Sequence, residues 1–411
     1  MNEIPQAETQ PSGTTVSERL KSLDAYRGLI MITLAFGGFG LASTAGLQIE
    51  INPESQFWKT IQNQCTHAQW TGCRCWDMIQ PSFMFMVGVS LAYSYAKRRK
   101  MGHSYVRMLS HACRRSIVLV FLGVFLSSNG GRSINWTFAN VLCQIGLGYC
   151  FLFLFWRRSL RTQAIAAAVL LIGTWLVYVL YPGTGIDVQA GAPDVGVAAD
   201  WAQEHLPDVG KAWHKNANLG HAVDLWLLNQ FPQTETFVFN RGGYPTINFI
   251  PSIATMLFGL MCGELLRLDR TGKQKIKVLL IAGICALAAG QLLHLAGICP
   301  IVKRIWTPSW AIFSTGWCCL ILAILYGIVD VLKFHRWTFP LAVVGSNSIV
   351  MYCMSHQLKP WVGTTLRMYM GRDIFQILGE SWEPLARSTI IGLAFWLICY
   401  WLYRRKMFLR V

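Results

Sequence analysis

The chain has 411 residues, of which 53% are hydrophobic and 14% are charged, and its formal net charge at neutral pH is +16. A soluble domain usually carries about 25% charged residues, so this composition excludes an ordinary soluble protein. The positive charge does not indicate a nucleic-acid-binding protein, because no basic face is interleaved with stacking aromatic side chains.

Residues 1–20 are polar and include Pro5, Pro11 and Gly13. The first apolar block is not preceded by a charged start, a short apolar core and a small-residue cleavage site, so we expect no cleaved signal peptide. The sequence predicts a disordered cytoplasmic tail over 1–20 and a single membrane domain over 21–411.

The apolar residues then fall into ten blocks, most of them near the 18–22 residues that a helix needs to cross a bilayer core of roughly 30 Å. Such segments are helical because lipid offers no partner for a free backbone amide. The blocks lie near 28–47, 78–96, 116–128, 138–156, 164–182, 248–266, 278–297, 309–331, 339–356 and 385–403. The third reaches full length only if the stretch before Arg114 contributes. The sequence therefore predicts an all-α polytopic membrane helix bundle of about ten transmembrane helices.

The distribution of Lys and Arg predicts the orientation of this bundle. With ten spans both termini share one side, and the segments on that side carry 24 basic residues against 11 in the opposite segments. Because short basic loops stay in the cytoplasm, we expect both termini to be cytoplasmic. A bacterial inner membrane is the expected location.

Three outer segments, near residues 48–76, 183–247 and 357–384, are too long for simple turns. A loop of this length is usually functional or disordered, and the tryptophans of 183–247 favour order. Within it, Asn218–Leu228 has apolar residues at helical spacing and is expected to form an amphipathic helix on the membrane surface. Together the three segments can roof a cavity.

The segment Cys65–Asp77 places His67 and Asp77 at the outer membrane boundary. A histidine titrates near neutral pH and can accept a proton from a nucleophile. Asp77 can cap the following helix or hold the imidazole in one tautomer. The ordinary alternative is that His67 is a surface residue of a loop.

The cysteines near His67 allow two interpretations, a zinc site or a disulfide. Cys65, His67, Cys73 and Cys75 are plausible zinc ligands, but one residue between two cysteines makes chelation tight, so we expect no metal. A disulfide that uses Cys65 is favoured, since an outer compartment permits one.

Polar residues in or beside apolar spans are costly and therefore candidates for substrate or cofactor binding. An interhelical hydrogen bond is the alternative role for each of them. Lys97–Lys100 is an orientation signal that can also attract cofactor phosphates. The candidates are Asp24, Arg27, Asn140, Gln144, Asn248, Asn347 and Ser348.

Several blocks of the chain resemble the membrane acyltransferases related to lysosomal heparan-alpha-glucosaminide N-acetyltransferase. The blocks are RLKSLDAYRG from Arg19, HAQWTGCRCWDMIQPSFMFMVGVS from His67, RRSIVLVFLGVFL from Arg114, TINFIPSIATMLFGLMCGELL from Thr246, IWTPSW from Ile305, GSNSIVMY from Gly345 and YRRKMFLRV from Tyr403. Their order covers roughly residues 19–411. Two positions depart from the family pattern: Ala35 stands where relatives have Asn, and the segment Leu142–Ile145 lacks an Arg.

The resemblance implies an acyl-CoA-dependent enzyme that carries an acetyl group across the membrane. Acetyl-CoA would be the cytoplasmic donor, and an amino sugar or related glycan the acceptor on the outer side. His67 would be the general base or the acyl carrier, with Asp77 at the family's acidic position. A homodimer is one assembly left open.

Two other function classes remain open. A multi-span transporter would move its substrate unaltered, but transporters often have inverted repeats and broken helices, and the sequence shows neither. An inactive relative that serves as a scaffold is compatible with the two departures from the family pattern. Labelled acetyl transfer to an acceptor distinguishes an enzyme from both.

Overall fold

The computed structural model describes residues 20–131 and 133–409, so the predicted tail lies, apart from Leu20, outside the described residues. Within these ranges the regular structure is helical, with sixteen α-helices and two isolated β-bridges. The helices are Lys21–Ala35 (α1), Leu41–Ile51 (α2), Gln56–Gln64 (α3), Ile79–Lys100 (α4), Tyr105–Ser127 (α5), Val141–Phe155 (α6), Leu160–Leu180 (α7), Ala199–His205 (α8), Leu219–Leu228 (α9), Phe249–Arg267 (α10), Gly272–Leu295 (α11), Pro308–Tyr326 (α12), Phe339–Ser346 (α13), Ser348–Gln357 (α14), Lys359–Met370 (α15) and Glu383–Arg404 (α16). The predicted all-α class is confirmed for the described part of the chain.

Local sequence sets where many of these helices begin. At seven N-termini a short polar side chain accepts a hydrogen bond from a backbone amide of the first turn, which satisfies a donor that the helix leaves free. These caps are Ser55, Ser104, Asn140, Ser159, Asn218, Thr271 and Thr307.

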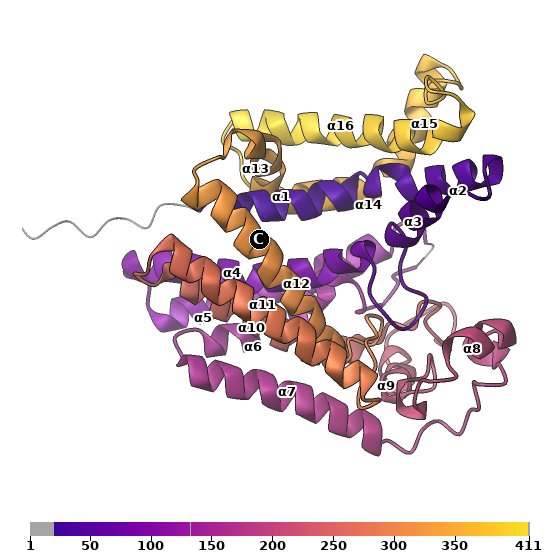
Figure 1. Cartoon of the computed structure of the whole chain (residues 1–411), viewed down its shortest axis with the longest axis horizontal. Helices are drawn as coiled ribbons and strands as arrows, with labels where there is room; N and C mark the ends of the chain where they lie inside the picture. The colour runs from indigo at the N-terminus through magenta and orange to yellow at the C-terminus, as the bar shows by residue number, and fades with distance from the viewer. Residues whose placement is uncertain (1–19, 132, 410–411) are drawn as a thin grey trace, which may run out of the picture.

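Most of the helices outside residues 183–247 form two groups (Figure 1). One contains α1, α2 and α13–α16, and the other contains α4–α7 and α10–α12. Helix α10 is central to the second group because it packs against α4, α6, α7 and α12. Glycines allow α4 and α10 to approach closely: a Cβ at Gly88 would overlap the carbonyl oxygen of Met256, and one at Gly259 that of Phe85. Small residues of this kind are typical of helix contacts in membranes.

Among the residues that the structure describes, six helices are long and apolar enough to cross a membrane, and the number rises to eight if each of two bent pairs is one span. The predicted count of about ten is therefore not confirmed. Helices occupy the other two blocks, but α4 ends in four basic residues and α6 has only 15 residues. The third block does extend toward the N-terminus as required, since α5 begins at Tyr105 and has 23 residues.

The two bent pairs are a feature that the sequence analysis missed. Helices α1 and α2 meet at a bend of 50°, and four successive residues between them, from Gly37 to Gly40, have positive φ. Helices α13 and α14 meet at 68°, and Asn347 lies at the break. Three of the four residues in the first bend are glycine, which adopts the left-handed region without a steric cost.

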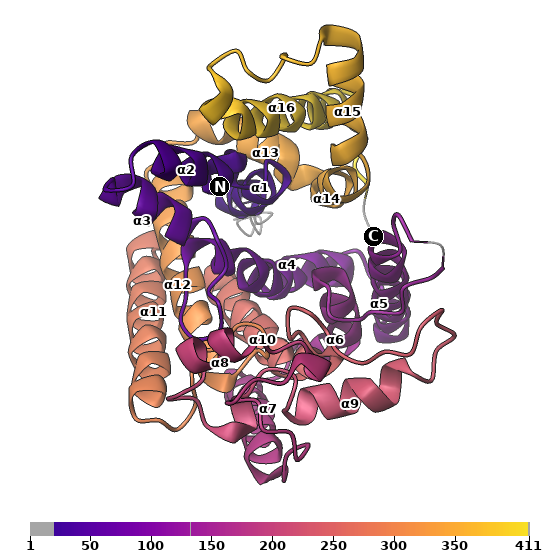
Figure 2. The ribbon, with the colours of Figure 1, turned by 90° about the vertical axis from the view of Figure 1, so that its right-hand side faces the viewer.

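Residues 183–247 fold into a compact lobe rather than a disordered loop. Its apolar core includes Val197, Leu206 and Trp213, and it packs against Trp70 and Tyr178. The predicted helix over Asn218–Leu228 is present as α9, with Asn218 as its cap. Figure 2 shows α8 and α9 together at the end of the bundle that also carries α2 and α3. We call this the loop end, and the end where α4 terminates in Lys97–Lys100 the basic end.

Candidate active site

The segment between α3 and α4 carries His67 and is tied to two distant parts of the chain. Trp70 is buried, and its indole nitrogen donates a hydrogen bond of 3.0 Å to the carbonyl oxygen of Trp213 in the lobe. The amide of Gly72 donates at 2.8 Å to the carbonyl oxygen of Ile301, and Thr71 forms a β-bridge with Val302. These contacts bring the connection between α11 and α12 alongside His67.

Asp77 holds the imidazole of His67. Its Oδ1 lies 2.7 Å from Nδ1 of His67, and its Oδ2 accepts the backbone amides of Ala68 and Arg74 at 3.0 and 3.1 Å. The carboxylate belongs to a short 3₁₀ turn, Cys75–Met78, that leads into α4. The side chain of Asp77 is 1% exposed, whereas that of His67 is 40% exposed. The pair therefore joins a fixed carboxylate to an accessible imidazole.

Lys303 completes this group from the connection between α11 and α12. Its Nζ lies 3.3 Å from Oδ1 of Asp77 and 3.0 Å from Nδ1 of His67, and its side chain is 7% exposed. An ionised carboxylate only accepts hydrogen bonds and an ammonium only donates them. Nδ1–H of His67 and the ammonium of Lys303 therefore both donate to the carboxylate of Asp77.

The environment shifts the pKa of both charged partners. Burial would raise the pKa of Asp77, but the hydrogen bond from His67, the charge of Lys303 and the amide of Ala68 together lower it. Burial lowers the pKa of Lys303 to about 8, although the negative charge of Asp77 opposes the shift. Asp77 is therefore ionised at neutral pH, and Lys303 is close to its titration range.

This arrangement leaves Nε2 of His67 open for chemistry. When Nδ1 donates to Asp77, Nε2 carries a lone pair, and no hydrogen bond among the described residues uses it. A carboxylate that orients an imidazole in this tautomer is the logic of hydrolytic triads. Nε2 can take a proton from a nucleophile or act as a nucleophile itself.

Two of the predicted binding residues lie close to this site. Nδ2 of Asn248 donates at 2.7 Å to the carbonyl oxygen of Arg304, the neighbour of Lys303. Nε2 of Gln144 donates at 3.1 Å to the carbonyl oxygen of Thr246, two residues before Asn248. Within the described part of the chain, the buried side-chain oxygens of Gln144 and Asn248 have no hydrogen-bond partner. Buried oxygens without donors are uncommon, so this turn at the start of α10 offers acceptors to a bound molecule.

The other predicted binding residues do not join His67. Asn140 caps α6 by accepting the amide of Cys143 at 2.9 Å. Asn347 donates to the carbonyl oxygen of Met407 and accepts the amide of Leu409, so it ties the break before α14 to the end of the chain. Ser348 is the first residue of α14.

Asp24 and Arg27 lie on α1, at the opposite end from the loop that carries His67. Asp24 is in the first turn of α1. The guanidinium of Arg27 donates to the hydroxyl of Ser90 on α4, which joins the two helix groups. These contacts match the alternative of interhelical hydrogen bonding for Arg27.

The expected disulfide is absent from the described structure. Cys65, Cys73 and Cys75 are all free thiols, so the prediction of a bridge that uses Cys65 is wrong. The His67 segment is instead fixed by Trp70, Gly72 and the bonds to Asp77. Among residues 20–131 and 133–409, no group of three or more His, Cys, Asp or Glu side chains is placed to hold a metal ion.

The sequence predicted no role for Lys303 and Arg304, because they stand out only as two basic residues of a short outer connection. Arg304 donates to the carbonyl oxygens of Gly242 and Ala68, which braces the lobe against the His67 segment. The available signal was their position just before the family block that begins at Ile305. Sequence spacing alone could not reveal a contact over 236 residues.

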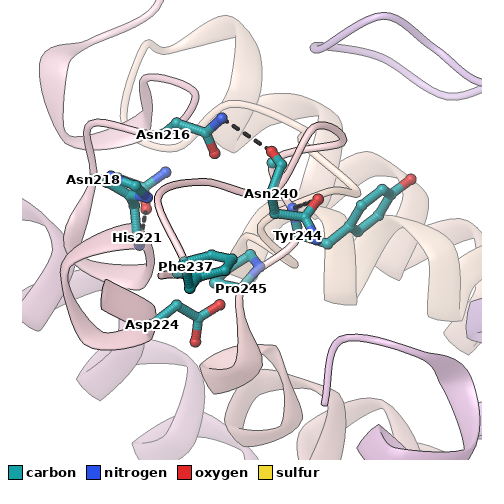
Figure 3. A pocket seen from close by; sticks show the side chains of 9 residues that line it. Asn216, Asn218, His221, Asp224, Phe237, Asn240, Tyr244 and Pro245 are labelled. Atoms are coloured by element: carbon teal, nitrogen blue, oxygen red, sulfur yellow. Dashed lines mark hydrogen bonds between the residues drawn. The ribbon is translucent and has the colours of Figure 1, made fainter. Parts of the chain in front are cut away.

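A small polar pocket lies in the lobe beside this site (Figure 3). Asn216, His221, Asp224 and Asn240 line it, and the ring of Tyr244 points away from it. Burial raises the pKa of Asp224 to about 6, although its hydrogen bonds with Thr246 oppose the shift. Tyr244 borders the pocket, and its ring points the other way, 5.5 Å from the guanidinium of Arg304. Tyr244 therefore connects the pocket to the His67 site.

No family model matches the chain, but two curated proteins resemble it over nearly its whole length. It is 22% identical over 424 residues to heparan-alpha-glucosaminide N-acetyltransferase of Homo sapiens, which covers 96% of this chain and 60% of that protein. It is 23% identical over 437 residues to the protein of the same name from Mus musculus, with coverage of 99% and 62%. The chain thus spans about three fifths of the length of these relatives, and the similarity supports a distant relationship to that family.

Proposed function

We propose that this protein is a transmembrane acetyltransferase. It moves an acetyl group from acetyl-CoA, bound from the cytoplasmic basic end, to an amino sugar or related glycan at the loop end. The observation that carries the proposal is the His67–Asp77 pair with Nε2 of His67 open, in a chain related to membrane N-acetyltransferases. The excess of basic residues on the side assigned to the cytoplasm supports the orientation.

In a direct mechanism His67 acts as a general base. The acceptor nitrogen attacks the thioester carbonyl, Nε2 of His67 takes the proton of that nitrogen, and the carbon–sulfur bond breaks. The imidazolium then returns the proton to the departing thiolate, which leaves as CoA–SH. The carboxylate of Asp77 stabilises the imidazolium between these steps.

In a covalent mechanism Nε2 of His67 attacks the thioester itself. The carbon–sulfur bond breaks, CoA leaves as the thiolate and takes up a proton from solvent, and the acetyl group remains on the imidazole until the acceptor amine attacks it. As the acyl–nitrogen bond of the imidazole breaks, its electron pair returns to Nε2, which takes the proton of the amine. Release of that proton to solvent balances the proton that the thiolate took up. Label that stays on the protein when acetyl-CoA is supplied without acceptor distinguishes this route from the direct one.

The decisive test supplies purified protein with labelled acetyl-CoA and a panel of amino sugars. We expect His67→Ala to abolish transfer and Asp77→Asn to lower kcat by about 10²- to 10⁴-fold, the usual contribution of an oriented base. His335→Ala, which changes a histidine bonded only within its own turn, is the matched control. Transfer that survives His67→Ala overturns the mechanism. The absence of transfer by the unchanged protein to every acceptor favours a scaffold.

A transporter is the second candidate, because the structure has two bent helix pairs. Broken helices often form substrate sites in transporters. Proteoliposomes distinguish the two functions: a transporter accumulates intact labelled amino sugar, whereas an acetyltransferase releases CoA and labels the acceptor on the opposite side.

A further inference from the structure

A second group of polar side chains joins α4, α5 and α6 near the basic end. Nη2 of Arg98 lies 2.7 Å from Nε2 of His111, and Nη1 of Arg115 donates at 3.2 Å to the hydroxyl of Tyr149. The guanidinium of Arg115 also lies over the ring of Tyr149, 4.6 Å from its centroid. The group comes from three different helices, so the fold assembles it.

The two arginines are partly buried without a negative partner. The Nε atoms of Arg98 and Arg115 are buried and have no hydrogen-bond partner. Among the described residues, the ion pairs to carboxylates involve His67, His205, Lys303 and Arg367, and none uses these two arginines. Burying a charge without a partner is costly, so binding an anion is the simplest way to compensate these two charges.

His111 does not supply the missing charge. A guanidinium only donates hydrogen bonds, so Nε2 of His111 is an acceptor and carries no proton. Tyr95, which lies 3.4 Å from Nδ1 of the same imidazole, is also uncharged. The group thus contains two permanent positive charges and neutral neighbours.

We propose that Arg98 and Arg115 form a binding site for phosphate groups, which takes the phosphates of the coenzyme donor. This inference rests on the proposed function for the identity of the ligand, but the site itself follows from the uncompensated arginines. Arginine is suited to the role because its planar fork pairs with two phosphate oxygens at once. The exposed residues of Lys97–Lys100 would attract the ligand, while the buried Nε atoms would bind it.

The position of Arg115 is compatible with a donor that reaches toward His67. Helix α5 ends toward the loop end at Ser127, 12 residues after Arg115. At 1.5 Å per residue this separation is about 18 Å along the helix. A coenzyme held by its phosphates at the arginines would therefore direct its thioester arm along the bundle.

The site is tested by binding to His67→Ala protein, which prevents turnover, in nanodiscs of neutral lipid. The probes are CoA, pantetheine and inorganic pyrophosphate. We expect Arg98→Gln and Arg115→Gln each to weaken CoA binding about 10-fold, the loss of one hydrogen bond to a charged group. Pantetheine, which lacks the phosphates, is expected to bind all variants equally. Arg99→Gln and Arg114→Gln change exposed neighbours of the same charge and are the matched controls.

Further measurements keep the outcome interpretable. Arg115→Lys retains the positive charge and replaces Arg115→Gln in the binding test if the glutamine variant lowers the thermal midpoint. We expect Arg115→Lys also to weaken CoA binding, because an ammonium cannot pair with two phosphate oxygens as the planar guanidinium does. Equal CoA affinity in His67→Ala protein with and without Arg98→Gln or Arg115→Gln overturns the site and leaves the acetyltransferase intact. Binding of pyrophosphate but not CoA supports the site and overturns the acetyltransferase. If anionic lipid competes with pyrophosphate and no variant alters CoA affinity, the arginines bind lipid headgroups and the proposal fails.

Discussion

At the scale of single residues, the carboxylate of Asp77 contacts two side chains, those of His67 and Lys303. Asp77 accepts from Nδ1 of His67 at 2.7 Å and lies 3.3 Å from the ammonium of Lys303. The ammonium balances the buried negative charge, which would otherwise favour protonation of Asp77 and loss of the imidazole's partner. In the proposed mechanism Lys303 is therefore a positioning residue, since it would act on the reaction through Asp77.

The titration of Lys303 predicts how activity depends on pH. Its pKa is about 8 in the fold, below the ordinary 10.4, so Lys303 loses its charge as pH rises through 8. We expect kcat/KM to fall over this range, because the neutral amine no longer balances Asp77. Lys303→Arg stays charged and is expected to remove the fall up to about pH 10, whereas Lys303→Met is expected to be weak at every pH. An unchanged alkaline fall in Lys303→Arg would assign it to another group.

Asp224 in the polar pocket predicts a change in stability. Its folded pKa of about 6 exceeds the ordinary value near 3.9, so the fold favours the protonated form and loses stability as pH rises from about 4 to 6. Asp224→Asn should therefore raise the thermal midpoint by a few degrees at pH 7 and little at pH 4. The exposed Asp200, changed to Asn, is the control. A variant less stable at pH 7 than the unchanged protein would contradict this.

At the scale of elements, helices followed from the sequence but long-range contacts did not. The amphipathic pattern of Asn218–Leu228 predicted α9. The pairing of His67 with Asp77 was also accessible, because both residues lie in one segment. Lys303 was not accessible, because its approach depends on a β-bridge between Thr71 and Val302 that no local pattern encodes. The bend after α1 was missed because apolar residues continue through it.

The bend after α1 predicts an effect on the site that can be separated from backbone strain. Gly38 has a φ of 60°, and a Cβ there would lie 3.0 Å from the ring of Trp76, whose centroid is 6.3 Å from that of His67. Gly102 has a φ of 77° and open space around it. We expect Gly38→Ala and Gly102→Ala each to lose about 1 kcal/mol of stability through left-handed strain. Only Gly38→Ala is expected to lower kcat several-fold, because only its Cβ presses on Trp76 beside His67. Equal activity in the two variants would show that the position of Trp76 does not affect the reaction.

At the scale of the whole molecule, composition predicted the membrane and not the number of spans. Length and hydropathy select α5, α7, α10, α11, α12 and α16, together with the two bent pairs. The helices α4 and α6 fall outside that set, although α4 follows the His67 segment and α6 packs against α10. Helices at the centre of a bundle contact protein rather than lipid, so they can be shorter or more polar than lipid-facing spans.

The orientation of the bundle is open to a direct test through Cys75, which is an exposed free thiol three residues before the end of the His67 segment at Met78. With the loop end outside, a membrane-impermeant maleimide should label Cys75 in intact cells. Cys75→Ser should be labelled less, because Cys65 and Cys73 are only partly exposed. Cys285 is also exposed, but it lies on the membrane span α11, where a water-soluble reagent does not reach a thiol that faces lipid. A cysteine placed at exposed Lys100 in the Cys75→Ser background should react only after the cells are permeabilised. The reverse pattern would put His67 in the cytoplasm, and the donor and acceptor would then have to approach from the sides opposite to those proposed.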